Sequence, residues 1–428
     1  VGRVVYRLTM GSVVMLLLFN VFTLFPSYMH GYFFWLFFGS LGIFYSWPTR
    51  GKIIEETMMG QFGEMRYLDS FEKTIFILSI FTFIISLPEL PLFQNIEALQ
   101  LYFDPSLKVS PMFWNFLTIL YQPFSNYSML YNLIWSFHFY FIGIGLFLLT
   151  FYSMLRYFFS RRLGMLGVFS VLSTWSFSRI LAEDYFTSIS TTIPLIWAWS
   201  LMWSSRSGTY RAGLFTGLVV AFLTMINPLN FILFPCGIFL SYFFFLKNKT
   251  DWFKKQWVKY NILGGAIALG VFIISIEGKE IQLLNSSLFF NLMMDHIYRK
   301  AFYIISPIGL ILITLYLSRS SRAFLSYVTF DDAKIKEVIV VISVLLFFGV
   351  LINPDFVKGF SLIWMLSFFA LIPLEWIFQS ISRLRSKRNL IYAMYILVCL
   401  LDSHLESRFR IIGKLFLEIE SFKYFIDL

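Results

Sequence analysis

Three acidic side chains follow one another directly behind an apolar segment of the chain. Glu89, Glu97 and Asp104 lie in SLPELPLFQNIEALQLYFDP, the stretch from Ser86 to Pro105. A carboxylate in this setting could act as a general base that deprotonates an acceptor hydroxyl or amine. Clustered carboxylates equally suit a hard divalent cation, which prefers oxygen ligands. The stretch therefore indicates either base catalysis or cation binding, and the residue types alone do not separate the two.

Each of these acids also has a simpler interpretation. Glu89 follows Pro88 and suits a solvated position at the end of an apolar segment. Asp104 precedes a proline and suits a turn. Glu97 has no such local explanation beyond an exposed loop acid, so it is the first candidate for catalysis or substrate binding.

A second group of charged residues lies further along the chain, in SRILAEDYFTS. Glu183 and Asp184 form a short acidic pair, and Arg179 precedes them. A guanidinium can hold a phosphate through two parallel hydrogen bonds, although Arg179 could instead pair with Asp184 or extend toward the membrane surface. Lys358, in NPDFVKGF, is a second candidate for phosphate binding.

The composition is that of a membrane protein. Hydrophobic residues make up 58% of the 428 residues and charged residues 14%, against roughly 25% charged in soluble domains. The net charge of +10 resides in short basic clusters between apolar runs. That distribution is typical of membrane topology, so we expect no nucleic-acid partner.

Apolar runs long enough to cross a bilayer recur along the whole chain. Their lengths predict an all-α polytopic bundle of about thirteen transmembrane helices. We place them near residues 8–24, 32–47, 74–86, 131–154, 163–181, 189–203, 212–226, 231–246, 262–276, 301–317, 338–352, 360–378 and 390–401.

The loop charges orient this bundle. With strict alternation, every strongly basic loop falls on one side, which the positive-inside rule assigns to the cytoplasm. The N-terminus is then cytoplasmic and the C-terminus extracytoplasmic. The acidic stretch opens a long outer loop, residues 87–130, whose FWNFLTILYQPF segment suits a helix lying in the interface.

Three parts are expected along the chain. Residues 1–70 hold two additional N-terminal transmembrane helices and a cytoplasmic linker, residues 71–402 form the core, and residues 403–428 form an extracytoplasmic tail. The opening residues resemble a signal peptide but lack a small-residue cleavage site, so we expect an uncleaved first span.

Familiar cofactor motifs are missing from the sequence. There is no Walker loop, GxGxxG, HExxH or GxSxG. Cys236 and Cys399 both lie in apolar segments, where packing is the expected role. Metal ligands and cofactors therefore stay unknown, with a divalent cation at the acidic residues as the one open alternative.

Several segments resemble the GT-C fold membrane glycosyltransferases, in particular the bacterial branch of protein mannosyltransferases and lipid A aminoarabinose transferases. LPELPLFQNIEALQ stands where that family has an acidic motif close to YDEA. RYFFSRRLGMLGVFSVLSTWSFSR resembles the family's basic hinge and the span after it. YRAGLFTGLVVAFLTMINPLNFILFP and NPDFVKGFSLIWMLSFFALIPL resemble a later pair of spans and a late outer loop with a basic residue.

The resemblance implies a GT-C-like core and a transferase of the bacterial inner (cytoplasmic) membrane. Its donor would be a sugar linked to polyprenyl phosphate, and its acceptor a component of the cell envelope on the outer face. By this resemblance Glu97, Asp104 or Asp184 would act as the base, with metal assistance in some members. Arg179, Glu183 and Lys358 would bind the substrate.

One residue departs from the family pattern. Ile96 stands where relatives have the catalytic aspartate, so only Glu97 of that acidic pair remains. An isoleucine cannot accept a proton. The alternative hypothesis is therefore a non-catalytic GT-C-like subunit that binds lipid or supports other chains of a larger membrane complex.

Overall fold

The computed structural model describes residues 2–22, 30–57, 68–87, 122–124, 127, 130, 133–134, 140, 143–182, 185–276, 305, 332–380 and 387–402. The expectation of an all-helical fold is confirmed for these residues, which contain no β-strand. The expected C-terminal tail and most of the long outer loop lie outside them.

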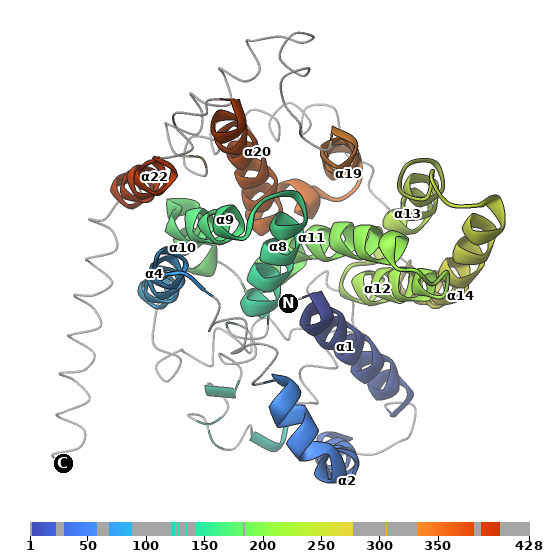
Figure 1. The fold of residues 1–428 in the computed structure, drawn as a ribbon. Helices are drawn as coiled ribbons and strands as arrows, with labels where there is room; N and C mark the ends of the chain where they lie inside the picture. Colours follow the sequence, from blue (N-terminus) through green and yellow to red (C-terminus); the bar gives the residue numbers. More distant parts are fainter. Residues whose placement is uncertain are drawn as a thin grey trace, which may run out of the picture. The chain divides into compact units, whose positions relative to one another are not determined.

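The helices are shown in Figure 1. The longer ones are α1 (Gly2–Phe22), α2 (His30–Thr57), α4 (Ser70–Ser86), α8 (Gly145–Phe158), α9 (Arg161–Ser173), α10 (Trp175–Ala182), α11 (Tyr185–Arg206), α12 (Ala212–Ile226), α13 (Leu233–Leu240), α14 (Asp251–Ile276), α19 (Asp332–Leu351), α20 (Gly359–Ser380) and α22 (Arg388–Asp402). Short helical turns are η3 (Gln122–Phe124), η5 (Pro228–Ile232), η6 (Ser241–Phe245) and η8 (Pro354–Val357).

Most helices extend beyond the apolar runs that predicted them. α12 begins and ends where the apolar run does, but α14 begins at Asp251 rather than near residue 262. Its first turn is stabilised by the Thr250 hydroxyl, which accepts from the Phe253 N–H, and by an ion pair between Lys254 and Asp251. Hydropathy detects only the apolar part of a helix. It misses a polar first turn, which is stabilised by capping and by charged side-chain pairs instead.

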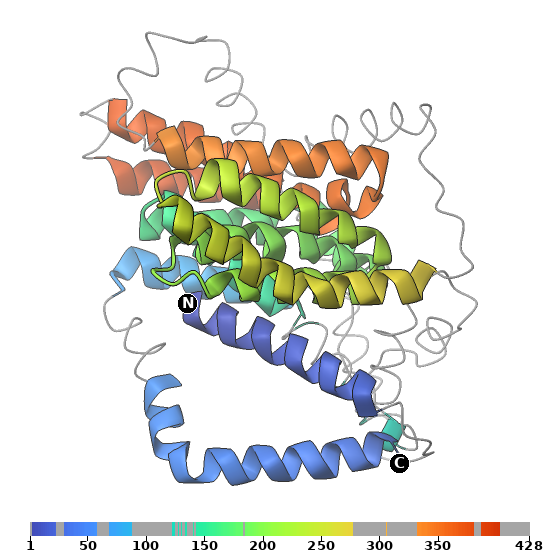
Figure 2. The same ribbon diagram turned by 90° about the vertical axis from the view of Figure 1, so that its right-hand side faces the viewer.

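Pro48 lies inside α2, and Figure 2 shows the helix bending in this region. A proline in a helix removes one backbone hydrogen bond and its ring clashes with the preceding turn, which accounts for the bend.

The expected segment 163–181 is not one continuous helix. It is interrupted at Thr174, whose backbone is extended, and forms α9 and α10. The Thr174 hydroxyl donates to the Val171 carbonyl and accepts from the Phe177 N–H, so this residue ends one helix and begins the next. The hydroxyls of Ser170 and Ser173 also donate hydrogen bonds to the carbonyls three residues earlier. Such bonds compete with the backbone hydrogen bonds of a regular helix.

Two Asn-Pro pairs begin short helical turns in the same way. The Asn227 side chain accepts from the Leu229 N–H at the start of η5, and the Asn353 side chain accepts from the Asp355 N–H at the start of η8. Both asparagines are extended and are followed by proline at the first helical position, where a missing N–H costs nothing. The sequence INPLNF, residues 226–231, contains the first of these turns.

Three of the described helical stretches are long and apolar enough to cross a membrane by length and composition: Pro228–Phe245, Asp251–Ile273 and Pro354–Glu375. Shorter apolar helices occur at Val4–Leu18, Tyr32–Phe44, Ala212–Ile226, Glu337–Leu351 and Arg388–Leu400. These helices are compatible with a membrane protein.

The chain forms two compact units, each built from three stretches. The first contains Val1–Asp69, Pro91–Leu146 and Ile196–Gln282. The second contains Ser70–Leu90, Phe147–Leu195 and Leu283–Leu428. The boundary within α11 falls one residue after Pro194, a proline inside the helix. The three-part division expected from the sequence stays a prediction.

Within the first unit, α12 and α14 lie side by side (Figure 1), and the residues that face one another show that they run in the same direction. A Cβ on Gly213 would meet the Trp257 carbonyl, and a Cβ on Gly217 would meet that of Asn261, one turn later on both helices. Asn261 also donates from its amide to the Gly213 carbonyl at 3.2 Å. The two backbones therefore touch, as small residues spaced by four allow.

Within the second unit, α9 packs against both α4 and α22 (Figure 1). α20 runs antiparallel to α9 and α10, because Phe360 at its start contacts Phe177 while Leu371 contacts Gly167. The starts of α9 and α20 thus mark opposite ends of this unit, and each end carries a cluster of polar residues.

Candidate functional site

Thr191 of α11 holds the start of α20. Its hydroxyl oxygen accepts a hydrogen bond of 3.2 Å from the Phe360 N–H, and its carbonyl accepts one of 2.7 Å from the Ser361 hydroxyl. All three residues are buried. Gly359, between η8 and α20, has a φ of +49°, and a Cβ there would lie 2.7 Å from the Thr191 hydroxyl. Glycine is required here by both the backbone angle and the space.

This junction fixes the backbone around Lys358, one of the two expected phosphate-binding cations. Lys358 is the residue after η8, in which Phe356 and Val357 are fully buried, and it precedes Gly359. The side chain itself is half-buried. Its backbone is therefore constrained on both sides.

Arg179, the other expected cation, lies on a segment that packs against this turn. Phe177 of α10 and Phe360 of α20 have ring centroids 5.4 Å apart. Arg179 follows Phe177 by two residues, and Lys358 precedes Phe360 by two. Arg179 is exposed. The structure thus brings the segments of both cations to one end of the second unit, which we call the α10–α20 end.

The expected acids do not lie among the described residues. Glu97 and Asp104 belong to the stretch after α4, and Glu183 and Asp184 stand between the end of α10 at Ala182 and the start of α11 at Tyr185. Their roles as base, metal ligand or substrate contact stay predictions. In the part of the chain that is described, no three His, Cys, Asp or Glu residues group together as a metal site would require.

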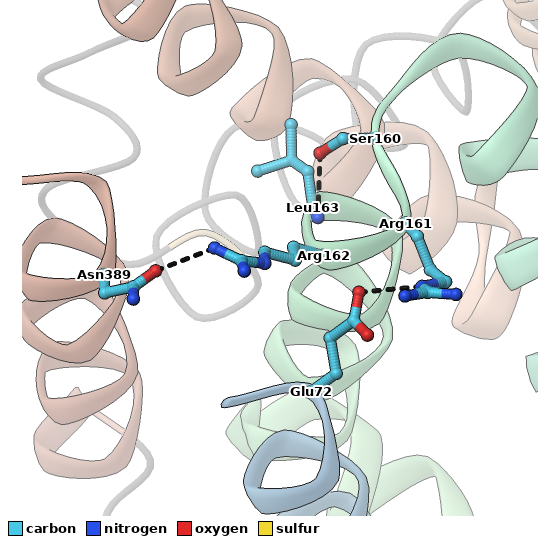
Figure 3. Close-up of polar contacts among 6 residues, drawn as sticks. All are labelled: Glu72, Ser160, Arg161, Arg162, Leu163 and Asn389. Carbon is cyan, nitrogen blue, oxygen red and sulfur yellow. Dashed lines mark hydrogen bonds and ion pairs between the residues drawn. The ribbon is translucent and has the colours of Figure 1, made fainter. Parts of the chain in front are cut away.

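The other end of the second unit carries an ion pair whose carboxylate is buried. The Arg161 Nε lies 2.8 Å from Glu72 Oε1, and Figure 3 shows this contact joining the starts of α4 and α9. The Glu72 side chain is 2% exposed and the Arg161 side chain 34%. A carboxylate this deeply buried is costly unless it is paired, so Arg161 compensates for the burial of Glu72 where α4 packs against α9.

The next residue, Arg162, extends in the opposite direction. Figure 3 shows it reaching toward α22, where its Nη1 donates to Asn389 Oδ1 at 2.9 Å. The start of α9 is capped by Ser160, whose hydroxyl accepts from the Leu163 N–H at 3.4 Å. Two adjacent arginines therefore join α9 to a helix on either side, and this region is called the α9–α22 end below.

Sequence reasoning missed Glu72, Thr191 and Asn389 as polar contacts between helices. Thr191 lies in an apolar run, where a threonine ordinarily has no role beyond packing. Its hydrogen-bond partners are 169 and 170 residues away in the sequence. Glu72 carried one available signal: it is an acid at the expected cytoplasmic start of a span, where basic residues are the rule.

Comparison of the chain with protein-family models, with curated proteins and with solved structures gives no match.

Proposed function

We propose that this chain is a multi-pass membrane glycosyltransferase of the bacterial inner membrane. It would transfer a sugar from a polyprenyl-phosphate donor to an envelope acceptor on the outer face. The proposal comes from the resemblance to GT-C transferases and from one structural observation at the α10–α20 end.

That observation is the contact between the segments of Arg179 and Lys358. The two cations come from parts of the chain far apart in sequence, yet Phe177 and Phe360 pack together beside them. Two cations presented from one end of a helical unit suit a lipid-linked phosphate, which needs positive charge at the membrane boundary. The hydrogen bonds from Phe360 and Ser361 to Thr191 hold the backbone next to Lys358 in place. A binding group needs such a rigid support.

The relative directions of the paired helices support the proposed alternation of spans. α4, α9 and α22 would all start in the cytoplasm, and Glu72, Arg161, Arg162 and Asn389 near these starts make contact. α11 and α20 would both start outside, and Thr191 contacts Phe360. α12 and α14 would both run outward, in agreement with their parallel packing.

In the proposed reaction, Glu97 or Asp104 would remove a proton from the acceptor, or hold a divalent cation together with Asp184. Arg179 and Lys358 would bind the donor phosphate, and Glu183 would contact the substrate. The sugar is transferred when the acceptor oxygen or nitrogen forms its bond to the sugar carbon and polyprenyl phosphate leaves.

The first experiment is native mass spectrometry of the full-length protein purified in mild detergent, followed by analysis of the retained lipids. We expect a co-purified polyprenyl-phosphate sugar that is lost in Arg179→Ala and Lys358→Ala. Arg211→Ala is the matched control, because it removes an exposed cation from the first unit. Glu97→Gln should retain the lipid and abolish transfer.

A preparation without such lipid, with partner chains in stoichiometric amount, would contradict the transferase proposal. It would favour the non-catalytic subunit. Ile96, in place of the family aspartate, is the residue that indicates this alternative. Equal lipid retention by wild type and both cation variants would also contradict the assigned phosphate site.

A further inference from the structure

Two helices of the second unit begin side by side with basic residues. The first turn of α9 contains Arg161 and Arg162, and that of α22 contains Arg388; neither first turn contains an acid. Helix N-termini carry a positive partial charge and normally attract acidic residues. Here the side chains add to the positive charge of the helix ends.

The acids of this region offset only part of that charge. Glu72 is paired with Arg161. Glu375 interacts electrostatically with Tyr392. Arg162 and Arg388 also interact with Tyr392, with the opposite sign. Among the described residues of the second unit near these helix starts, the acids are Glu72 and Glu375, and the cations are Lys73, Arg156, Arg161, Arg162, Lys387 and Arg388.

An apolar stripe begins immediately beyond these charges. Leu390, Met394 and Leu397 of α22 are 58%, 59% and 57% exposed. Their spacing of four and three residues puts them on one face of the helix. Lys387 and Asn389, which precede the stripe, are exposed as well. The surface is therefore cationic at the start of α22 and apolar along its length.

We propose that this surface binds an anionic phospholipid. Its phosphate would lie at Arg162 and Lys387, and an acyl chain would lie along Leu390, Met394 and Leu397. The hydrogen bond from Arg162 to Asn389 places a guanidinium at the start of α22, where it can meet a phosphate in forked geometry. The adjoining stripe selects a lipid over a free anion, because a soluble phosphate would leave it uncovered.

This inference is independent of the transferase proposal. It requires only that α22 faces the bilayer, and it concerns the end of the second unit opposite the Arg179 and Lys358 segments. With the proposed topology the lipid would belong to the cytoplasmic leaflet.

The test is native mass spectrometry of the full-length protein in mild detergent, titrated with dioleoylphosphatidylglycerol and, separately, dioleoylphosphatidylcholine. We expect tighter binding of the anionic lipid. A basic residue near an anionic lipid surface contributes about fivefold in affinity, so Arg162→Gln combined with Lys387→Gln should weaken phosphatidylglycerol binding about 25-fold. Phosphatidylcholine binding should not change.

Two control proteins separate binding from folding. Arg211→Gln with Lys259→Gln removes two exposed cations from the first unit and should leave the affinity unchanged. Arg162→Lys with Lys387→Arg keeps both charges and should retain most of the binding. Unaltered phosphatidylglycerol affinity in the double glutamine variant would overturn the proposal. Displacement by millimolar inorganic phosphate, with no effect of Leu390→Gln and Met394→Gln, would also overturn it in favour of a free anion.

Discussion

Thr191 makes two hydrogen bonds to residues 169 and 170 positions later, one through its hydroxyl and one through its carbonyl. Only the first depends on the side chain. It satisfies the Phe360 N–H, which has no intrahelical partner because it lies in the first turn of α20. A buried N–H without a partner costs about 1–3 kcal/mol. The contact therefore stabilises the turn that carries Lys358.

Replacing Thr191 with valine should leave the Phe360 N–H buried without a hydrogen-bond partner. Valine keeps the shape and removes the acceptor, so we expect the free energy of unfolding to fall by about 1–3 kcal/mol. Thr191→Ser keeps the acceptor and should lose less, about 1 kcal/mol for one buried methyl group. Denaturant titration of the purified protein in detergent measures both. A valine variant as stable as the wild-type protein would show that the hydroxyl contact contributes nothing.

At the scale of elements, helices pair by two different means. α12 and α14 pack through glycines whose backbones touch, with no room for a side chain at Gly217 or Gly213. α4 and α9 pair through a buried charge, and α9 and α22 through an arginine and an asparagine. Close packing is the usual means within a bilayer, and ion pairs are the usual means at its edge.

Gly217→Val tests the glycine contact. A side chain there would meet the Asn261 carbonyl and lie 2.7 Å from the Gly265 nitrogen, so the helices must separate. We expect the free energy of unfolding to fall by about 1–3 kcal/mol. Gly270→Val is the matched control, because a Cβ at Gly270 of α14 meets nothing within 4 Å. Equal stability of the two variants would contradict the packing described.

A double-mutant cycle of Glu72→Gln and Arg161→Gln tests the ion pair. The hydrogen bond is charged and Glu72 is buried, but Arg161 is partly solvated, so we expect a coupling energy of about 1–2 kcal/mol. The Lys254–Asp251 pair is the control, since the Asp251 side chain is 80% exposed; its cycle should give at most about 0.5 kcal/mol. Additive effects at Glu72 and Arg161 would rule out a coupling between α4 and α9.

At the scale of the whole molecule, the proposed topology puts the basic loop after η6 on the cytoplasmic side and the turn before α20 on the outer side. Lys247→Cys and Lys358→Cys, each made with Cys236→Ala and Cys399→Ala, report these two sides. A membrane-impermeant maleimide should label Lys358→Cys in intact cells and Lys247→Cys only after permeabilisation. Labelling of both from the same side would contradict the alternation.

The amino-acid sequence alone determines the helical class and the approximate position of most helices. α12 coincides with its apolar run, and α20 and α22 differ from theirs by one or two residues at either end. This works because a continuous apolar run of this length, bounded by polar residues, favours a helix, which satisfies the backbone hydrogen bonds within the segment itself. Hydropathy is less informative at Thr174, where a hydroxyl competing for backbone hydrogen bonds divides an otherwise uniform apolar segment.

Only the tertiary structure decided which helices meet and through which residues. Thr191 and Asn389 have no distinguishing local pattern, and the unusual position of the acid Glu72 does not indicate its partner. The partners of these three residues lie 89 to 227 residues away. Likewise, Arg179 and Lys358 were candidates by charge, but the packing of Phe177 on Phe360 is what relates their two segments. Periodicity and charge are properties of neighbouring residues along the chain, whereas the side chains that hold two helices together are selected by folding.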